Sequence, residues 1–120
     1  MQKENLYKKK YDSVKKNREF RSLFKNGKNS VTDAFVCYCF MNKLAVNRLG
    51  IVASKKSVGG AVKRNRAKRV IREAFRIAEP DLRSRTDKRY DFVFIARAKT
   101  TEYKSTQVYE LMRELMEKLG

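Results

Sequence analysis

The chain has 120 residues, the length of one domain, and 42% of them are hydrophobic, which suffices for one modest core. Its 30 lysine and arginine residues against 13 acidic residues give a formal net charge of +17, and it has no histidine. Such an excess of positive charge indicates a polyanionic partner. The absence of histidine excludes hydrolytic mechanisms that depend on a histidine base, and with them a protein nuclease of that type.

The two cysteines, Cys37 and Cys39, are too few for a disulfide framework. Without histidine they also cannot complete a zinc site, which takes about four ligands, so we interpret them as reduced, core-type thiols. No apolar stretch approaches the ~20 residues that cross a bilayer, and the first residues lack the apolar centre of a signal peptide. The composition predicts a soluble cytoplasmic protein that does not associate with membranes.

Residues 1–16 are rich in lysine and predict a flexible basic N-terminal arm, followed by a single domain over residues 17–120. A short helix is expected at the start of the domain, because Asn17 can cap its beginning and Gly27 its end. The apolar positions of this helix repeat at helical spacing: Phe20, Leu23 and Phe24.

Residues 34–41 alternate as a β-strand whose two faces are both apolar. One face carries Phe35, Cys37, Cys39 and Met41. The other face carries Val36, Tyr38 and Phe40. Because neither face is polar, either both faces are covered or one of them is a binding surface. A turn over residues 42–47 is expected to lead into a second strand, residues 49–53, paired with the first.

Residues 61–78 give the strongest helical pattern in the chain. One side is apolar: Ala67, Val70, Ile71, Ala74, Phe75 and Ala78. At ~100° per residue the opposite side is polar and basic: Asn65, Lys68, Arg69, Arg72 and Arg76, with Arg64 and Arg66 on the flanks. The helix is expected to end at Glu79–Pro80, with a polar loop over residues 81–89.

A further strand is predicted over residues 90–96 and a last helix over residues 104–119. The acidic residues of the last helix balance its basic ones, which is typical of a structural cover rather than a nucleic-acid face. The resulting order, α-β-β-α-β-α, predicts a two-layer α/β sandwich.

The positive charge is concentrated between residues 54 and 76, where nine basic residues accompany one acid, Glu73. A solvated helix face normally mixes both signs, so we interpret this segment as a polyanion-binding face. Five of the nine are arginines, whose planar fork suits phosphate. Asn65 adds an amide that can read a base edge or a sugar hydroxyl.

The aromatic residues allow two interpretations. If Phe20 and Phe24 pack fully against Val36, Tyr38 and Phe40, all five belong to the core. If the first helix stands off the strand, they line a groove on which unpaired bases stack, worth about 1–3 kcal/mol per base. The isolated carboxylates offer no paired general acid and base, so no catalytic residue and no metal site is predicted.

Residues 54–76 closely resemble the signature of the bacterial ribonuclease P protein family. Arg64-Asn65-Arg66 matches the Arg-Asn-Arg helix of the family, and Lys68, Arg69 and Arg72 match the basic positions that follow it. The resemblance extends to the first helix (residues 15–27), to the cleft strand FVCYCF and to the later strand over residues 92–99. It covers nearly the whole chain from residue 15 to residue 119.

The resemblance implies the order αβββαβα, a mostly antiparallel central sheet and a left-handed βαβ crossover, against the usual right-handed rule. Three strands before the long helix require the first predicted strand to be split near Asp33. Family members assemble with a large catalytic RNA that removes the 5′ leader of precursor tRNA. The resemblance therefore implies an endoribonuclease subunit in which the RNA and Mg²⁺ carry the hydrolysis.

The resemblance also implies two binding surfaces. The catalytic RNA would contact the basic helix through Arg64, Asn65, Arg66, Lys68, Arg69, Arg72 and Arg76. The single-stranded leader would lie in a cleft formed by Phe20, Phe24, Val36, Tyr38, Phe40, Lys55 and Lys56. The expected partners are ribonuclease P RNA and precursor tRNA, with no obligatory protein partner and no cofactor bound by the protein alone. A non-catalytic RNA-binding protein of ribosomal type remains the alternative.

Overall fold

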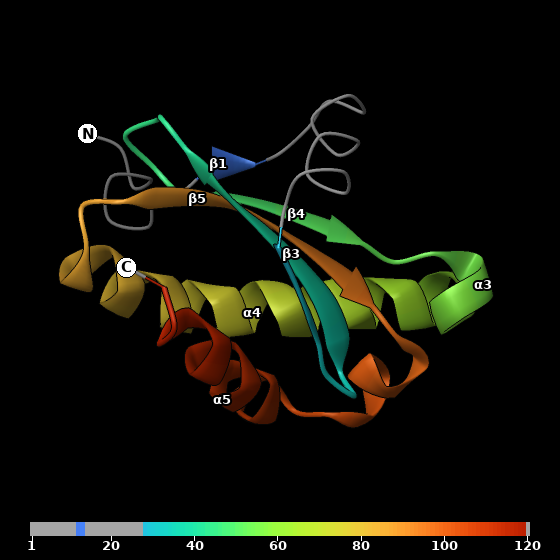
Figure 1. Ribbon diagram of the computed structural model, residues 1–120. Helices are drawn as coiled ribbons and strands as arrows, with labels where there is room; N and C mark the ends of the chain where they lie inside the picture. Colours follow the sequence, from blue (N-terminus) through green and yellow to red (C-terminus); the bar gives the residue numbers. More distant parts are fainter. Residues whose placement is uncertain (1–11, 14–27, 120) are drawn as a thin grey trace, which may run out of the picture.

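The computed structural model describes residues 12–13 and 28–119 and shows a sheet covered on one face by helices (Figure 1). Its elements are, in chain order, β1 (Asp12–Ser13), β2 (Lys28–Val31), β3 (Phe35–Asn42), β4 (Arg48–Val52), α3 (Lys55–Val58), α4 (Ala61–Arg85), β5 (Arg89–Ala96), the 3₁₀ helix η1 (Ala98–Glu102) and α5 (Ser105–Met116). Both long helices, α4 and α5, lie on the same side of the sheet. The predicted two-layer α/β architecture is confirmed.

The five strands form one sheet in the order β1-β4-β5-β3-β2. Strand β5 lies in the middle, antiparallel to β3 and parallel to β4. It is the central strand because both of its faces are apolar, and Phe92, Val93 and Phe94 are 0% exposed. The prediction that residues 49–53 pair with the first strand is wrong, since β5 lies between β4 and β3.

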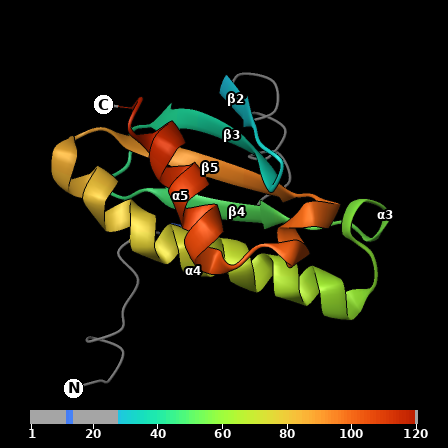
Figure 2. The same ribbon diagram turned by 90° about the horizontal axis from the view of Figure 1, so that it is seen from below.

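Strands β4 and β5 are parallel neighbours joined by α3 and α4, which makes a βαβ crossover. Figure 2 shows this unit from the side of the helices, with β4 and β5 both pointing to the right and β5 above β4. When the view is turned so that the two strands point upward, β5 lies to the left of β4. The crossover is therefore left-handed, although such connections are almost always right-handed. The implied split near Asp33 is also confirmed, because β2 ends at Val31 and β3 begins at Phe35.

The predicted first helix, residues 17–27, lies outside the described residues. So does most of the predicted basic arm, residues 1–16. Two residues of the arm, Asp12 and Ser13, form the short strand β1, which pairs with β4 in parallel.

The core lies between the sheet and the two long helices. Every member of the apolar stripe predicted for α4 is buried. The ring of Phe75 meets those of Phe92 and Phe94 edge-on, with centroids 5.5 and 6.0 Å apart, and Phe35 meets Phe94 at 5.0 Å. Aromatic pairs in this arrangement add to the hydrophobic stabilisation from burial, so these four rings fix α4 on β3 and β5.

Helix α4 continues through Pro80 to Arg85, and the prediction that it ends at Glu79–Pro80 is wrong. Proline inside a helix removes a backbone hydrogen bond and costs about 3 kcal/mol or more. The extension is stabilised by Leu82, which is 0% exposed, and by Glu79, which is 1% exposed and pairs with Arg83 at 3.1 Å. Burial of an apolar side chain and satisfaction of a buried carboxylate therefore offset the cost of the proline.

Glu79 is also tied to the sheet through Asn47, which is completely buried. The Asn47 amide nitrogen donates to the Glu79 carboxylate at 2.9 Å, and its oxygen accepts from the backbone N–H of Tyr90 at 2.7 Å. One amide thus joins the loop before β4, the extended part of α4 and the start of β5.

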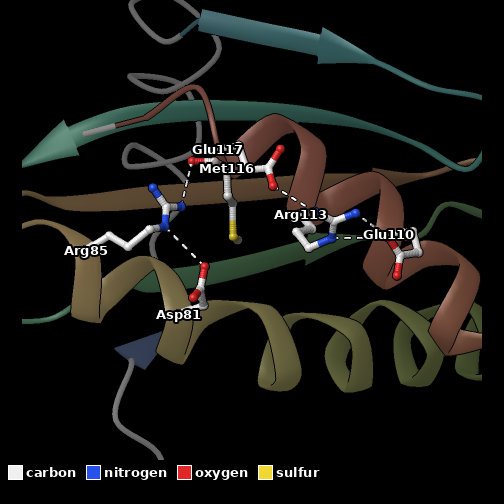
Figure 3. Close-up of polar contacts among 6 residues, drawn as sticks. All are labelled: Asp81, Arg85, Glu110, Arg113, Met116 and Glu117. Atoms are coloured by element: carbon white, nitrogen blue, oxygen red, sulfur yellow. Dashed lines mark hydrogen bonds and ion pairs between the residues drawn. The ribbon is translucent and has the colours of Figure 1, made fainter.

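The extended part of α4 also holds the end of α5 (Figure 3). The Arg85 guanidinium donates to the Met116 carbonyl at 3.1 Å and to the Asp81 carboxylate at 3.1 Å. Because the last carbonyls of a helix have no partner within it, a cation placed there is stabilising. On α5 itself Arg113 bridges Glu110 and Glu117, both at 2.7 Å.

We expect Arg85→Ala to lower the free energy of unfolding by about 1 kcal/mol, because a charged donor to the Met116 carbonyl is lost from a partly exposed site. Urea titration followed by circular dichroism measures the change. Arg72→Ala is the matched control, since Arg72 is exposed on the same helix, and it should stay within about 0.5 kcal/mol of the parent. Equal effects of the two substitutions would contradict the role given to Arg85.

Candidate nucleic-acid interface

The basic helix begins at a sharp turn. Gly59 connects α3 to α4 with φ +123°, a conformation that L side chains rarely adopt, and a Cβ there would lie 3.0 Å from the Lys63 side chain. Glycine is therefore required at this position. The turn directs α4 away from α3, so that Arg64-Asn65-Arg66 occupies the first two turns of the long helix.

The predicted RNA-binding residues form one surface on the N-terminal half of α4, which we call the basic face: Arg64, Asn65, Arg66, Lys68, Arg69, Arg72 and Arg76. Asn65, Arg66, Arg69, Arg72 and Arg76 are exposed, whereas Arg64 and Lys68 are half-buried. Within the described part of the chain, Arg76 is the member of this face that has an acidic partner, Glu73. The hydrogen bond from Arg76 lowers the pKa of the Glu73 carboxyl.

Two arginines of the basic face differ in their surroundings. The Nε atom of Arg64 is buried and has no hydrogen-bond partner among the described residues, an arrangement that costs about 1–3 kcal/mol. The Nε atom of Arg66 donates to the Thr101 carbonyl of η1 at 2.9 Å. Arg66 is therefore fixed to a neighbouring element, and Arg64 holds a donor that nothing in the described chain satisfies.

The face of the sheet that α4 and α5 do not cover is apolar and partly open. We call it the cleft face. Strand registers place Tyr38 beside Val93 and Val36 beside Ile95. Val93 is completely buried, while Tyr38, Val52 and Ile95 pack around it and are half-buried. The aromatic strand was given two interpretations, complete burial in the core or the lining of a groove. Its residues on this face are neither completely buried nor completely exposed, so they match neither interpretation in full.

The other members of the predicted cleft lie at the rim of this face or outside the described residues. Phe40 is 41% exposed near the end of β3. Lys55 and Lys56 are exposed on α3, directly after β4. Phe20 and Phe24, the predicted members from the first helix, lie outside the described residues.

The two cysteines lie on the helical side of β3. Cys37 is 1% exposed, and burial raises the pKa of its thiol well above the usual value. Neither cysteine forms a disulfide.

A hollow of about 630 Å³ opens where the cleft face meets η1. It is lined by Asp33, Val36, Ser57, Ile95, Ala96, Arg97, Ala98 and Lys99. Arg97, Lys99 and Ser57 were not among the predicted site residues. For Arg97 and Lys99 a signal existed in the sequence, namely two cations directly after an apolar strand.

Residues 8–120 match the family model described as Ribonuclease P. The chain belongs to the ribonuclease P protein family. The resemblance drawn from Arg64-Asn65-Arg66 is therefore confirmed, and the chain is a protein subunit of a bacterial tRNA-processing endoribonuclease.

Individual members of the ribonuclease P family agree over nearly their full length. The ribonuclease P protein component of Clostridium kluyveri is 40% identical over 107 residues, which are 89% of this chain and 93% of that protein. The component of Caldanaerobacter subterraneus is 38% identical over 109 residues, or 91% and 90% of the two chains.

Solved ribonuclease P proteins share the fold. The protein from Thermotoga maritima superposes with a TM-score of 0.74 at 31% identity, covering 91% of this chain and 98% of that one. The protein from Staphylococcus aureus gives a TM-score of 0.70 at 32% identity, with 88% and 92% covered.

Among the described ranges, 12–13 and 28–119, no cluster of three histidine, cysteine or acidic residues could hold a metal ion. Nor is any helix in those ranges long and apolar enough to cross a membrane. The chemistry that this part of the ribonuclease P chain offers is cation, amide and aromatic contact.

Proposed function

We propose that the chain binds the catalytic RNA of ribonuclease P through the basic face, and the single-stranded 5′ leader of precursor tRNA over the cleft face. The observation that carries the proposal is the separation of these surfaces. Cations gather on a helix of one layer, and half-buried apolar side chains lie on the far side of the sheet. One chain can therefore hold two RNA segments at once.

The basic face suits a folded RNA backbone. Arginine forks contact phosphate through two parallel hydrogen bonds. Among the described residues, Arg76 is the one arginine of this face for which an acid competes with phosphate. A phosphate or base oxygen near Arg64 would satisfy its buried Nε atom. Asn65, exposed between the two arginines, supplies both a donor and an acceptor for a base edge or a 2′-hydroxyl.

The cleft face suits an unpaired strand. Half-exposed aromatic side chains such as Tyr38 and Phe40 give stacking surfaces that tolerate any base. Cations stand at the rim to meet the backbone of the strand: Lys55, Lys56, Arg97 and Lys99. The leader of a precursor tRNA is single-stranded and matches this combination.

In the proposed enzyme the RNA and its Mg²⁺ ions carry the hydrolysis, and the protein binds no cofactor of its own. Precursor tRNA is the substrate, the compartment is the cytoplasm, and no further protein is required. The rival function, an RNA-binding protein of ribosomal type, shares the basic face but gives no reason for a second surface that favours an unpaired leader.

Reconstitution separates these functions. Rigorously RNA-free protein should leave precursor tRNA intact. Addition of a bacterial ribonuclease P RNA with Mg²⁺ at low salt should give mature 5′ ends, faster than the RNA alone does. Cleavage at that site by the protein alone, or no effect of the protein on the RNA reaction, would overturn the proposal.

Substitution of Arg64 and Arg66 by Ala should weaken assembly with the catalytic RNA about tenfold or more, because charge-assisted phosphate contacts are lost at both positions. Filter binding with labelled RNA measures the change. The matched control removes the same charge elsewhere by Lys88→Ala together with Lys118→Ala, two exposed positions away from the basic face. An equal loss in both double variants would show that net charge alone drives binding.

Tyr38→Ala should leave assembly nearly unchanged and weaken binding of precursors that carry a leader by about 1–3 kcal/mol, the value of one stacked base. Tyr38→Phe keeps the ring and should retain most of that affinity. The measurement is the affinity ratio of precursor to mature tRNA, together with the melting temperature. If Tyr38 acts only as core, Tyr38→Ala lowers the melting temperature by several degrees and harms both affinities in parallel.

A further inference from the structure

The helix η1 is hydrogen-bonded both to the basic face and to the turn that precedes β3. On one side, the Thr101 carbonyl accepts from Arg66 of the basic face at 2.9 Å. On the other side, η1 reaches the turn between β2 and β3, where the Thr100 hydroxyl donates to the Ala34 carbonyl. The five residues of η1 therefore connect two distant parts of the chain. Arg66 lies 35 positions before its partner Thr101, and Ala34 lies 66 positions before its partner Thr100.

Thr100 is the centre of this junction. Its side chain is 0% exposed, and its hydroxyl also accepts from the backbone N–H of Arg97 at 2.9 Å. The Arg97 guanidinium in turn donates to the Thr32 carbonyl at 2.9 Å. The buried hydroxyl therefore accepts a hydrogen bond from the residue after β5 and donates one to the turn.

The turn that Thr100 holds is itself rigidly built. The Thr32 hydroxyl donates to the Phe35 carbonyl at 2.9 Å and accepts from the Phe35 N–H at 3.0 Å. Such side-chain bonds to nearby backbone define the turn locally. A shift of η1 against Ala34 would therefore move the turn as one piece rather than deform it.

The same two segments contribute residues to the lining of the hollow on the cleft face. The turn and the start of β3 contribute Asp33 and Val36, and the end of β5 with η1 contributes Arg97 and Lys99. Pairing of β3 with β5 sets the distance between Val36 and Ile95, and beyond the end of that pairing the bond from Thr100 to Ala34 holds η1 against the turn. Positions of this kind matter because binding geometry must be held by side chains that are themselves locked.

We propose that Thr100 is a positioning residue for leader binding: its hydroxyl holds η1, which carries Lys99 of the hollow and is bonded to the basic face, against the turn that carries Asp33. The proposal deepens the function proposed above and rests on it. Valine has nearly the shape of threonine but neither donates nor accepts, so Thr100→Val would leave the Ala34 carbonyl and the Arg97 N–H unpaired in a buried site. Thr100→Ser restores both bonds.

The test measures, in holoenzyme reconstituted with a bacterial ribonuclease P RNA, the affinity ratio of precursor to mature tRNA and the affinity of protein for RNA. Thr100→Val should lower the ratio about fivefold to tenfold and change assembly less than twofold. Thr100→Ser should keep the ratio within twofold of the parent. Melting curves establish that each variant is folded at the assay temperature.

An unchanged ratio in folded Thr100→Val, or an equal loss in Thr100→Ser, would overturn the proposal, because a purely structural role lowers the melting temperature without affecting the ratio. If Thr100→Val does not fold, Thr32→Val and Thr32→Ser give the same comparison from the other side of the junction. A parent holoenzyme that does not prefer precursor over mature tRNA would contradict the proposed function itself, independently of any variant.

Discussion

The affinity of the chain for ribonuclease P RNA is expected to fall by about a thousandfold or more between about 50 and 200 mM monovalent salt. Proteins that neutralise about six or more phosphates release that many counterions, and the logarithm of affinity then falls linearly with the logarithm of salt concentration. The basic face offers six cations, five of them without an acidic partner among the described residues. Filter binding or fluorescence titration across a salt series measures the slope.

Single substitutions show how much each residue contributes to the slope of log affinity against log salt concentration. Arg69→Gln should reduce its magnitude by about one, the value of one phosphate contact. Arg76→Gln should reduce it less, because Arg76 reaches a phosphate only by leaving Glu73. An affinity that is nearly independent of salt would contradict a phosphate-dominated interface, and equal effects of the two substitutions would contradict the local pairing of Arg76.

Asp91→Ala is expected to lower the free energy of unfolding by about 3–5 kcal/mol, the range for removing one partner of a buried ion pair. Asp91 is 4% exposed and accepts from Arg48 at 2.8 and 2.6 Å and from Asn42 at 2.8 Å. Its loss removes the acceptor of three hydrogen bonds at a site where the Arg48 side chain is 18% exposed. Since Asn42, Arg48 and Asp91 come from β3, β4 and β5, the carboxylate joins three strands of the sheet.

Denaturant unfolding of Asp91→Ala and Asp91→Asn measures this effect. The asparagine variant keeps the shape and one acceptor, so it should lose less than the alanine variant. Asp87→Ala, at an exposed loop position two residues before β5 begins, serves as the surface control and should stay within about 0.5 kcal/mol of the parent. A loss below about 1 kcal/mol for Asp91→Ala would show that the network does not stabilise the sheet.

The amphipathic part of the fold could be predicted from the sequence. The apolar stripe and the basic face of α4 follow from a repeat of 3.6 residues, which needs no knowledge of the neighbouring elements. The two faces of β3 follow in the same way from a repeat of two. Neither repeat identifies the neighbours of a strand, so the insertion of β5 between β3 and β4 was missed.

The rest depends on contacts between residues far apart in sequence. Pro80 favours the end of a helix locally, and the buried Leu82 and the Asn47–Glu79 bond override it. Arg66 and Arg69 are both exposed arginines of the same helix. They differ because Arg66 donates to the carbonyl of Thr101, which lies 35 residues further along the chain. The hollow at η1 likewise exists only once β3, α3, β5 and η1 have met.

The central place of β5 has a consequence for synthesis of the chain. β5 is the last strand to leave the ribosome, and it is the strand on which β3 and β4 both pair. Until residue 96 has emerged, β3 and β4 lack the strand on which both of them pair, and the apolar side of α4 lacks the complete sheet that buries it in the folded chain. Pairings of high sequence separation form slowly, so synthesis of this protein includes an interval in which the basic segment over residues 54–76 has left the ribosome before the sheet that supports it is complete.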